Sequence, residues 1–279
     1  MPKPRILFMG TPAFAVPALE GLVKNGYPVI GVVTQPDRPQ GRGRTMAPPP
    51  IKVVAEALGL TVLQPEKVRT QDFLETFRQL APDLVVVAAF GQILPTEIIR
   101  GQQRGCINIH PSLLPKYRGA APINWALIRG DQKTGVTIMQ MDEGVDSGDI
   151  LLQEETPILA EEDYGELHDR LAKLGSELLI ITLAMLEPGT LQPRRQEHHL
   201  ATLAPRLGRE DCLIPWKNDS RSIVALIRGL PPSPCAYTCL EGKQLKIYRA
   251  VAETTAVTET PGTVVGETED GLRVAAGEG

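Results

Sequence analysis

Residues 1–188 contain short apolar runs that alternate with segments of helical spacing. The apolar runs predict strands, which are 6–9, 29–34, 84–88, 106–110, 135–141 and 150–154. Apolar residues three and four positions apart predict helices, which are 17–24, 51–58, 73–80, 123–128 and 167–186. Strands that alternate with helices indicate an α/β fold with a doubly wound, mostly parallel sheet.

The pattern changes after residue 188. Residues 189–206 lack periodicity, so they are predicted to be a linker. Residues 207–279 contain one helical segment, followed by short β segments at 245–248, 262–265 and 272–274, which predict a smaller C-terminal β-barrel domain. The barrel is expected to be incomplete, because the sequence stops at a turn-like Gly277-Glu278-Gly279.

The length and composition suit a globular protein with a hydrophobic core. The 279 residues are 42% hydrophobic and 22% charged, enough for one large or two ordinary domains. The formal net charge of −4 argues against a protein that coats nucleic acid, but it is compatible with a local basic patch.

The cysteine spacing and the hydropathy of the chain indicate whether it binds zinc and in which cellular compartment it is found. The four cysteines show no paired C-x-x-C pattern with matching histidines, so zinc is not expected. We find neither a signal-peptide pattern nor an apolar stretch of membrane-spanning length. We therefore expect a cytoplasmic protein with free thiols and no membrane partner.

A polar pair stands at the end of the apolar run 106–110. In a strand, Asn108 and His110 point to the same face, because side chains alternate. Asn108 can donate to a developing oxyanion, and His110 can move a proton near neutral pH. Downstream, Asp146 lies between Gly144 and Gly148, in a turn that could aim it at the same imidazole. An amide, an imidazole and a carboxylate together suit acyl transfer to an amine.

Each of these residues also has a plainer interpretation. His110 is compatible with a buried structural histidine, but Asn108 on the same face favours an acid/base role. The carboxylates within 142–149 suggest a cation loop, yet their spacing does not match an EF-hand. The flanking glycines better explain a turn that re-aims one aspartate, so we expect no metal.

The glycine-containing loops lack the patterns of nucleotide binding. Residues 10–14 lack the second and third glycines of the dinucleotide fingerprint, and residues 41–45 lack the lysine of a P-loop. The polar stretch 34–44 follows a predicted strand and contains Arg38, Arg42 and Arg44. It is either a solvated loop or a flexible contact to nucleic-acid phosphates.

These motifs resemble those of the folate-dependent formyltransferase superfamily. The resemblance rests on Asn-x-His-x-Ser-Leu-Leu-Pro from residue 108 and on Gly-Val-Asp-Ser-Gly-Asp from residue 144. A narrower resemblance, to the members that formylate methionyl-tRNA, rests on residues 8–12, 34–43, 118–123 and 134–142. Pro111 departs from the small residue that is frequent at its position.

The resemblance implies a domain organisation and a set of site residues. It implies a Rossmann-like catalytic domain over 1–188, a linker over 189–206 and an OB-like tRNA-binding domain over 207–279. The implied catalytic residues are Asn108, His110 and Asp146. The implied folate-binding residues are Ser112, Leu113, Leu114 and Pro115. The implied tRNA-binding loop spans 35–49, with Arg42 as its key position.

The implied reaction transfers a formyl group from 10-formyltetrahydrofolate to the α-amino group of methionine esterified to initiator tRNA. A monomer is expected. A formyltransferase for a small amine, such as glycinamide ribonucleotide or an amino-sugar nucleotide, would share the catalytic residues but would not need both the arginine loop and the C-terminal domain. A non-catalytic RNA-binding module would not need the three catalytic residues together.

Overall fold

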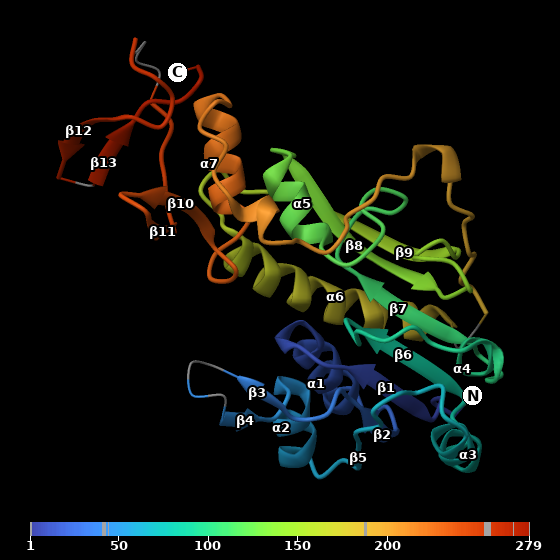
Figure 1. Cartoon of the computed structure of the whole chain (residues 1–279). Helices are drawn as coiled ribbons and strands as arrows, with labels where there is room; N and C mark the ends of the chain where they lie inside the picture. The colour runs from blue at the N-terminus through green and yellow to red at the C-terminus, as the bar shows by residue number, and fades with distance from the viewer. Residues whose placement is uncertain are drawn as a thin grey trace. The chain divides into compact units, whose positions relative to one another are not determined.

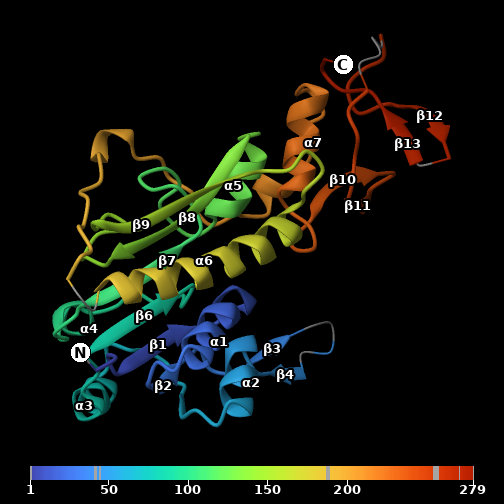
Figure 2. The same cartoon turned by 180° about the vertical axis from the view of Figure 1, so that it is seen from behind.

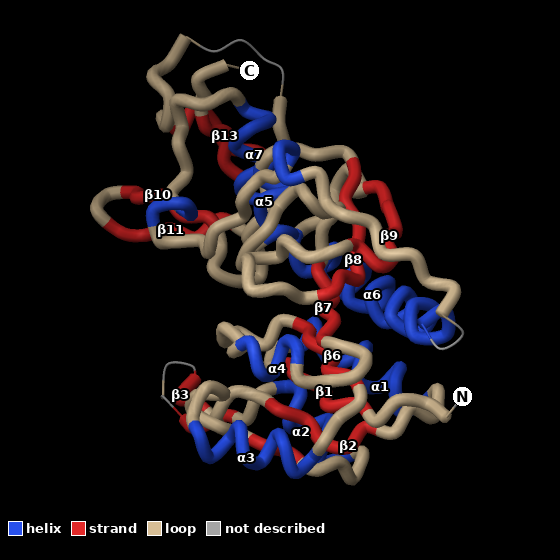
Figure 3. Tube along the Cα trace, turned by 90° about the vertical axis from the view of Figure 1, so that its right-hand side faces the viewer, coloured by secondary structure: helices blue, strands red, loops and turns tan. Residues whose placement is uncertain are grey.

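The computed structural model describes residues 2–40, 43, 45–186, 189–253, 258–269 and 271–278. The chain divides into two compact units, each assembled from separate stretches of sequence. Unit 1 comprises residues 1–118, 135–155 and 169–203, and unit 2 comprises residues 119–134, 156–168 and 204–279. Helices and strands alternate along unit 1, as the colours of Figure 3 show.

The main sheet has seven strands (Figure 1). Their spatial order is β5 (Val62–Leu63), β2 (Val29–Val33), β1 (Ile6–Gly10), β6 (Leu84–Ala88), β7 (Cys106–His110), β8 (Lys133–Gln140) and β9 (Ile150–Pro157). Neighbours from β5 to β7 pair in parallel, and β8 pairs antiparallel with β7. The mostly parallel sheet predicted from the apolar runs is confirmed.

One face of the sheet is covered by two short helices. A hydrophobic core joins β1 and β6 to α3 (Gln71–Leu80) and α4 (Thr96–Arg100). Its members include Leu7, Met9, Val85, Val87, Phe73, Phe77 and Ile98. Because β1, β6 and β7 are buried along their whole length, the opposite face must be covered as well.

The long helix α6 (Tyr164–Leu186) covers the opposite face. It approaches the sheet so closely that a Cβ on Gly175 would lie 2.8 Å from Cγ2 of Ile109. It also lies beside α1 (Val16–Lys24), as Figure 2 shows. There, Ser176 Oγ donates to the carbonyl of Pro17 over 2.6 Å. Within the described ranges, no helix has the length and apolar character needed to span a membrane.

Unit 2 contains helices and antiparallel strand pairs. Helices α5 (Pro122–Ile128) and α7 (Ser220–Arg228) contact each other, and Asn124 Nδ2 donates to the carbonyl of Gly229 over 2.8 Å. The strand pairs are β10 (Ala236–Leu240) with β11 (Lys243–Ile247), and β12 (Val264–Thr268) with β13 (Gly271–Val274). These antiparallel pairs confirm the β character predicted for the C-terminal part.

Some elements of unit 1 differ from the prediction. Strand β5 and helix α4 were not predicted, because each is too short to show a hydrophobic period. The polar stretch 34–44, predicted as a loop, contributes β3 (Arg38–Gln40), which pairs antiparallel with β4 (Thr45–Ala47). A short pair of this kind is held by main-chain hydrogen bonds, so it needs no apolar alternation.

Asp37 anchors the base of the β3–β4 pair. Its carboxylate accepts Gln64 Nε2 at 2.7 Å and Lys52 Nζ at 2.8 Å. Lys52 lies on α2 (Pro50–Ala57), so the pair is tied to the body of unit 1. The bond from Gln64, followed by that from Lys52, holds the pKa of Asp37 below its ordinary value.

We predict that Asp37→Asn lowers the free energy of unfolding at neutral pH. The folded-state pKa is depressed, so the stabilisation is complete above the unfolded pKa of about 4 and is lost as the pH falls through the folded value. Urea denaturation of wild type and variant should therefore differ at about pH 7 and converge toward about pH 3. Glu66→Gln removes an exposed carboxylate near Gln64 and serves as the control. If the difference in the free energy of unfolding between wild type and Asp37→Asn is equal at both pH values, the charge of Asp37 does not contribute to stability.

Candidate active site

Strand β7 places Asn108 and His110 on one face of the sheet. Asn108 lies opposite Val87 of β6 and Met139 of β8, and His110 lies opposite Thr137 of β8. Both polar side chains are buried, with 9% and 4% of their surface exposed. The structure thus puts the two residues where the alternation of a strand predicts them.

Cys106 lies on the same face of β7 and has no reactive character. Its Sγ atom is 3.5 Å from Sδ of Met141, and burial raises the pKa of the thiol far above its ordinary value. A thiol of this kind stays protonated and is a poor nucleophile. The chemistry of this face therefore depends on the amide and the imidazole.

The loop after β8 brings Asp146 to the same region. Ser147 Oγ donates to Asp142 Oδ1 over 2.8 Å, which closes the turn. A Cβ on Gly148 would lie 2.0 Å from the carbonyl oxygen of Gln140, so only glycine fits there. Asp146 itself has a φ of 47°, in the left-handed region that few residues other than glycine adopt.

The carboxylates of this loop face different partners. Glu143 Oε1 pairs with Arg100 Nε at 2.8 Å, and Asp142 closes the turn, whereas Asp146 faces β7. Considering the described residues alone, no three His, Cys, Asp or Glu side chains gather in a metal-binding arrangement. The geometry is that of a turn that re-aims one aspartate.

Asn108, His110 and Asp146 meet at the carboxyl end of β7. His110 Nδ1 lies 3.7 Å from Asp146 Oδ2, and Asn108 Nδ2 donates to Asp146 Oδ1 over 3.5 Å. Both distances are long for hydrogen bonds. The side chain of Asp146 is 17% exposed, so the trio is reachable from solvent.

The second ring nitrogen of His110 fixes the orientation of the imidazole. Nε2 lies 2.9 Å from the main-chain carbonyl oxygen of Tyr117. A carbonyl oxygen only accepts, so Nε2 carries the hydrogen, and in the neutral ring Nδ1 presents its lone pair. Nδ1 is therefore the atom that can take up a proton. Asp146 then lies close enough to stabilise the resulting positive charge.

The segment expected to bind folate is partly built into the core. Ser112 is fully buried, and its Oγ donates to the carbonyl of Lys116 over 2.6 Å. Leu114 is 2% exposed, whereas Leu113 and Pro115 are half-buried. Of these four predicted residues, Leu113 and Pro115 are the ones that present side-chain surface.

The predicted tRNA-binding arginines are only partly described. Arg38 lies in β3 and is exposed, with Nη2 3.5 Å from Oε1 of Gln35. Arg42 and Arg44 lie outside the described residues. The structure therefore places one of the three cationic side chains on the surface of the β3–β4 pair.

The loop after β6 lies beside the trio, although we predicted no role for it. Val87 pairs with Asn108, so residues 89–92 leave the sheet next to that amide. Gly91 has a φ of 83°, and Thr11 Oγ1 donates to the carbonyl of Phe90 over 2.9 Å. A glycine soon after a buried strand, at the carboxyl edge of a parallel sheet, is the sequence signal that identifies such a loop.

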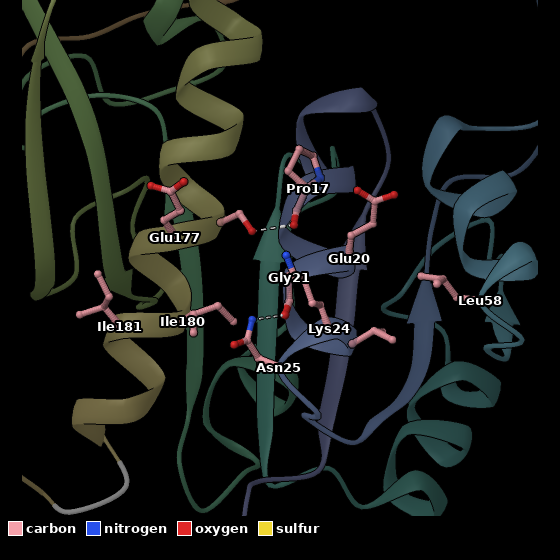
Figure 4. Close-up of a pocket in the computed structure, with 11 residues that line it drawn as sticks. Pro17, Glu20, Gly21, Lys24, Asn25, Leu58, Glu177, Ile180 and Ile181 are labelled. Atoms are coloured by element: carbon pink, nitrogen blue, oxygen red, sulfur yellow. Dashed lines mark hydrogen bonds between the residues drawn. The ribbon is translucent and has the colours of Figure 1, made fainter.

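A groove elsewhere on unit 1 contains none of these residues. It lies between α1 and α6 and is lined by Glu20, Lys24, Glu177 and Ile181, among others (Figure 4). Helix α1 starts beyond the carboxyl end of β1 and runs back along the sheet, so Lys24 lies toward the opposite edge. The groove and the trio are therefore separate features.

Comparison with known proteins identifies relatives along the whole chain. Residues 4–183 match the formyl transferase family, and residues 206–279 match the C-terminal domain of formyl transferases. A methionyl-tRNA formyltransferase of Syntrophus aciditrophicus is 54% identical over 279 residues, which is 100% of this chain and 89% of that protein. One of Citrifermentans bemidjiense is 51% identical, over 99% of this chain and 86% of that protein.

Solved structures of lower identity share the fold. An N-formyltransferase from Helicobacter canadensis, in complex with folinic acid and dTDP-3-aminofucose, has a TM-score of 0.72 at 18% identity, over 99% of this chain and 96% of that one. HypX from Aquifex aeolicus, in complex with tetrahydrofolic acid, has a TM-score of 0.70 at 18% identity, over 99% of this chain and 42% of that one. The family matches at both ends of the sequence, together with relatives more than 50% identical, show that this chain belongs to the formyl transferase family.

Proposed function

We propose that this chain transfers the formyl group of 10-formyltetrahydrofolate to the α-amino group of methionyl initiator tRNA, in support of translation initiation. The relatives that carry the name methionyl-tRNA formyltransferase and align over the whole chain support this acceptor. The main structural support for acyl-transfer chemistry is the position of the His110 imidazole. Its Nδ1 faces Asp146, beside the amide of Asn108.

The reaction exchanges one C–N bond for another. The acceptor amine has an ordinary pKa of about 8, so a useful fraction is neutral and nucleophilic at neutral pH. A bond forms between the amine nitrogen and the formyl carbon, and the bond from that carbon to N10 of the folate breaks. The amine loses a proton, and the departing folate nitrogen gains one.

The residues of the trio divide this work. Nδ1 of His110 takes up the proton from the amine and supplies one to the departing nitrogen, directly or through a water. The charge of Asp146 stabilises the imidazolium between these two transfers. The amide of Asn108 donates to the oxyanion that develops on the formyl oxygen.

We assign the substrates to the elements around the trio. The donor is assigned to Ser112, Leu113, Leu114 and Pro115, with contact through Leu113, Pro115 and the main chain. The folate-type ligands bound in the two solved structures of similar fold support this class of donor. The tRNA is assigned to Arg38, Arg42 and Arg44, because a net charge of −4 requires local cations to attract a polyanion.

The same proposal extends to the organisation of the chain. Residues 1–188 supply the catalytic domain, and residues 207–279 form an OB-like domain that helps to hold the tRNA, with 189–206 between them. The protein acts as a cytoplasmic monomer, without a membrane partner and without a metal.

The direct test is formylation by the purified protein. With 10-formyltetrahydrofolate as the donor, we expect formylmethionine on charged initiator tRNA and much less product on charged elongator methionine tRNA. A dTDP-amino sugar serves as the competing acceptor, because a structural neighbour was solved with one. Formylation of the sugar but not of the tRNA would contradict the proposed acceptor.

We predict that His110→Gln lowers kcat about 10²–10⁴-fold, the usual share of a positioned acid/base. Glutamine has a similar size and can still donate to the carbonyl of Tyr117, but it cannot take up a proton. Single-turnover formylation measures the loss, and donor titration serves as the control, since the affinity for folate should be nearly unchanged. More than half of the wild-type activity would show that His110 is only a buried structural residue.

We predict that Asp146→Asn lowers kcat by about 10²-fold, because it removes the charge that stabilises the imidazolium. Asparagine tolerates the left-handed backbone at this position, so the turn should persist. Glu143→Gln removes a negative charge from the same loop, but that charge pairs with Arg100 rather than His110. The control should keep most of the activity. A wild-type kcat for Asp146→Asn would show that Asp146 serves only to shape the turn and has no catalytic role.

A further inference from the structure

The stretch 194–202 lies against the candidate active site within unit 1. It belongs to the segment predicted as a linker, yet it is hydrogen-bonded to two parts of the catalytic face. Arg194 and Ile150 of β9 exchange main-chain hydrogen bonds, each of 2.8 Å. This bridge fixes the start of the stretch beside the loop that carries Asp146.

Gln196 is the buried centre of this stretch. It is 5% exposed, whereas its neighbours Arg195 and Glu197 are exposed. Its Nε2 donates to the carbonyl of Asp146 over 2.9 Å and to that of Gly148 over 2.7 Å. Both hydrogens of the amide are therefore used on the loop that aims Asp146.

The amide oxygen of Gln196 contacts the other side of the site. It accepts Arg118 Nε at 3.1 Å and Arg118 Nη2 at 2.6 Å. Arg118 follows Tyr117, whose carbonyl oxygen accepts His110 Nε2. One side-chain amide therefore connects the loop of Asp146 to Arg118, the residue next to the Tyr117 carbonyl that orients His110.

Thr202 reinforces the same connection. Its Oγ1 accepts the main-chain N–H of Tyr117 at 2.9 Å, and its carbonyl accepts the N–H of Arg118 at 2.9 Å. The two residues that flank His110, Tyr117 and Asp146, are thus both held through their main chains by residues 196–202. A left-handed aspartate needs such bracing, because its backbone conformation is unfavourable by itself.

We infer that Gln196 is a positioning residue for formyl transfer, which holds Asp146 and the Tyr117 carbonyl in register around His110. The inference rests on the proposed function. Gln196 acts through the loop and not on the reacting atoms, so its loss should lower turnover while donor binding stays intact. A shift of about 1 Å in a catalytic group is enough to cost about 10²-fold in rate.

The test uses the full chain with Gln196→Leu, Gln196→Glu and the control Gln192→Leu. Gln192 is an exposed glutamine of the same segment, so its replacement should leave kcat and the KM for the donor unchanged. Gln196→Leu should lower kcat about 10- to 100-fold, with the donor KM within about twofold of wild type. Gln196→Glu keeps an acceptor for Arg118, but it replaces the amide nitrogen with an oxygen that cannot donate to the carbonyls of Asp146 and Gly148. It should therefore lower kcat as much as Gln196→Leu does.

A double-mutant cycle separates positioning from general destabilisation. In an Asp146→Asn background, Gln196→Leu should lower kcat by a smaller factor than it does in wild type, because the part of its effect that acts through the charge of Asp146 is already lost. Equal fold-losses in the two backgrounds, an unchanged kcat, or a loss shared equally by kcat and donor KM would each overturn the inference. Each variant is compared with the wild-type protein in the formylation of initiator tRNA. If the wild-type protein itself does not formylate this tRNA, the result contradicts the proposed function and not the role of Gln196.

Discussion

The hydrogen bond between His110 Nε2 and the carbonyl oxygen of Tyr117 is the contact on which the site depends. It settles which ring nitrogen carries the hydrogen, and it turns the other nitrogen toward Asp146. Without this contact the buried imidazole could present either nitrogen to a substrate. The surrounding structure serves largely to keep the carbonyl of Tyr117 and the carboxylate of Asp146 on the two sides of the ring.

The two halves of the site are built in different ways. Asn108 and His110 lie on a strand that pairs on both edges, so their positions follow from the register of the sheet. Asp146 lies on a loop in a left-handed conformation and needs local support. The side chain of Asp142, the glycine at 148 and the amide of Gln196 supply that support from three directions.

The sequence was sufficient to predict the elements that have a clear period. The valine-rich run 84–88 and the alternation around Asn108 and His110 both appear in the structure as expected. The β3–β4 pair, β5 and α4 were not predicted, because main-chain pairing and single turns leave little hydrophobic pattern. Helix α4 also shows how a short element can still bury side chains, since Ile98 and Ile99 are both buried.

Polar contacts between residues far apart in the sequence could not be predicted either. Gln196 lies in a segment without periodicity, and its partner Asp146 is 50 residues away in sequence. No local pattern indicates which of several glutamines becomes buried. Similarly, the motif that indicates folate binding by residues 112–115 does not reveal that the side chains of Ser112 and Leu114 are buried.

The most direct test of this account is the tautomer of His110 in the free protein. Nitrogen-15 NMR of the imidazole, assigned by comparison with His110→Gln, distinguishes a hydrogen on Nε2 from one on Nδ1. The account predicts that the neutral ring carries its hydrogen on Nε2, with an unprotonated Nδ1. A neutral ring with the hydrogen on Nδ1 would contradict it, because the proton-accepting atom would then face Tyr117 and not Asp146.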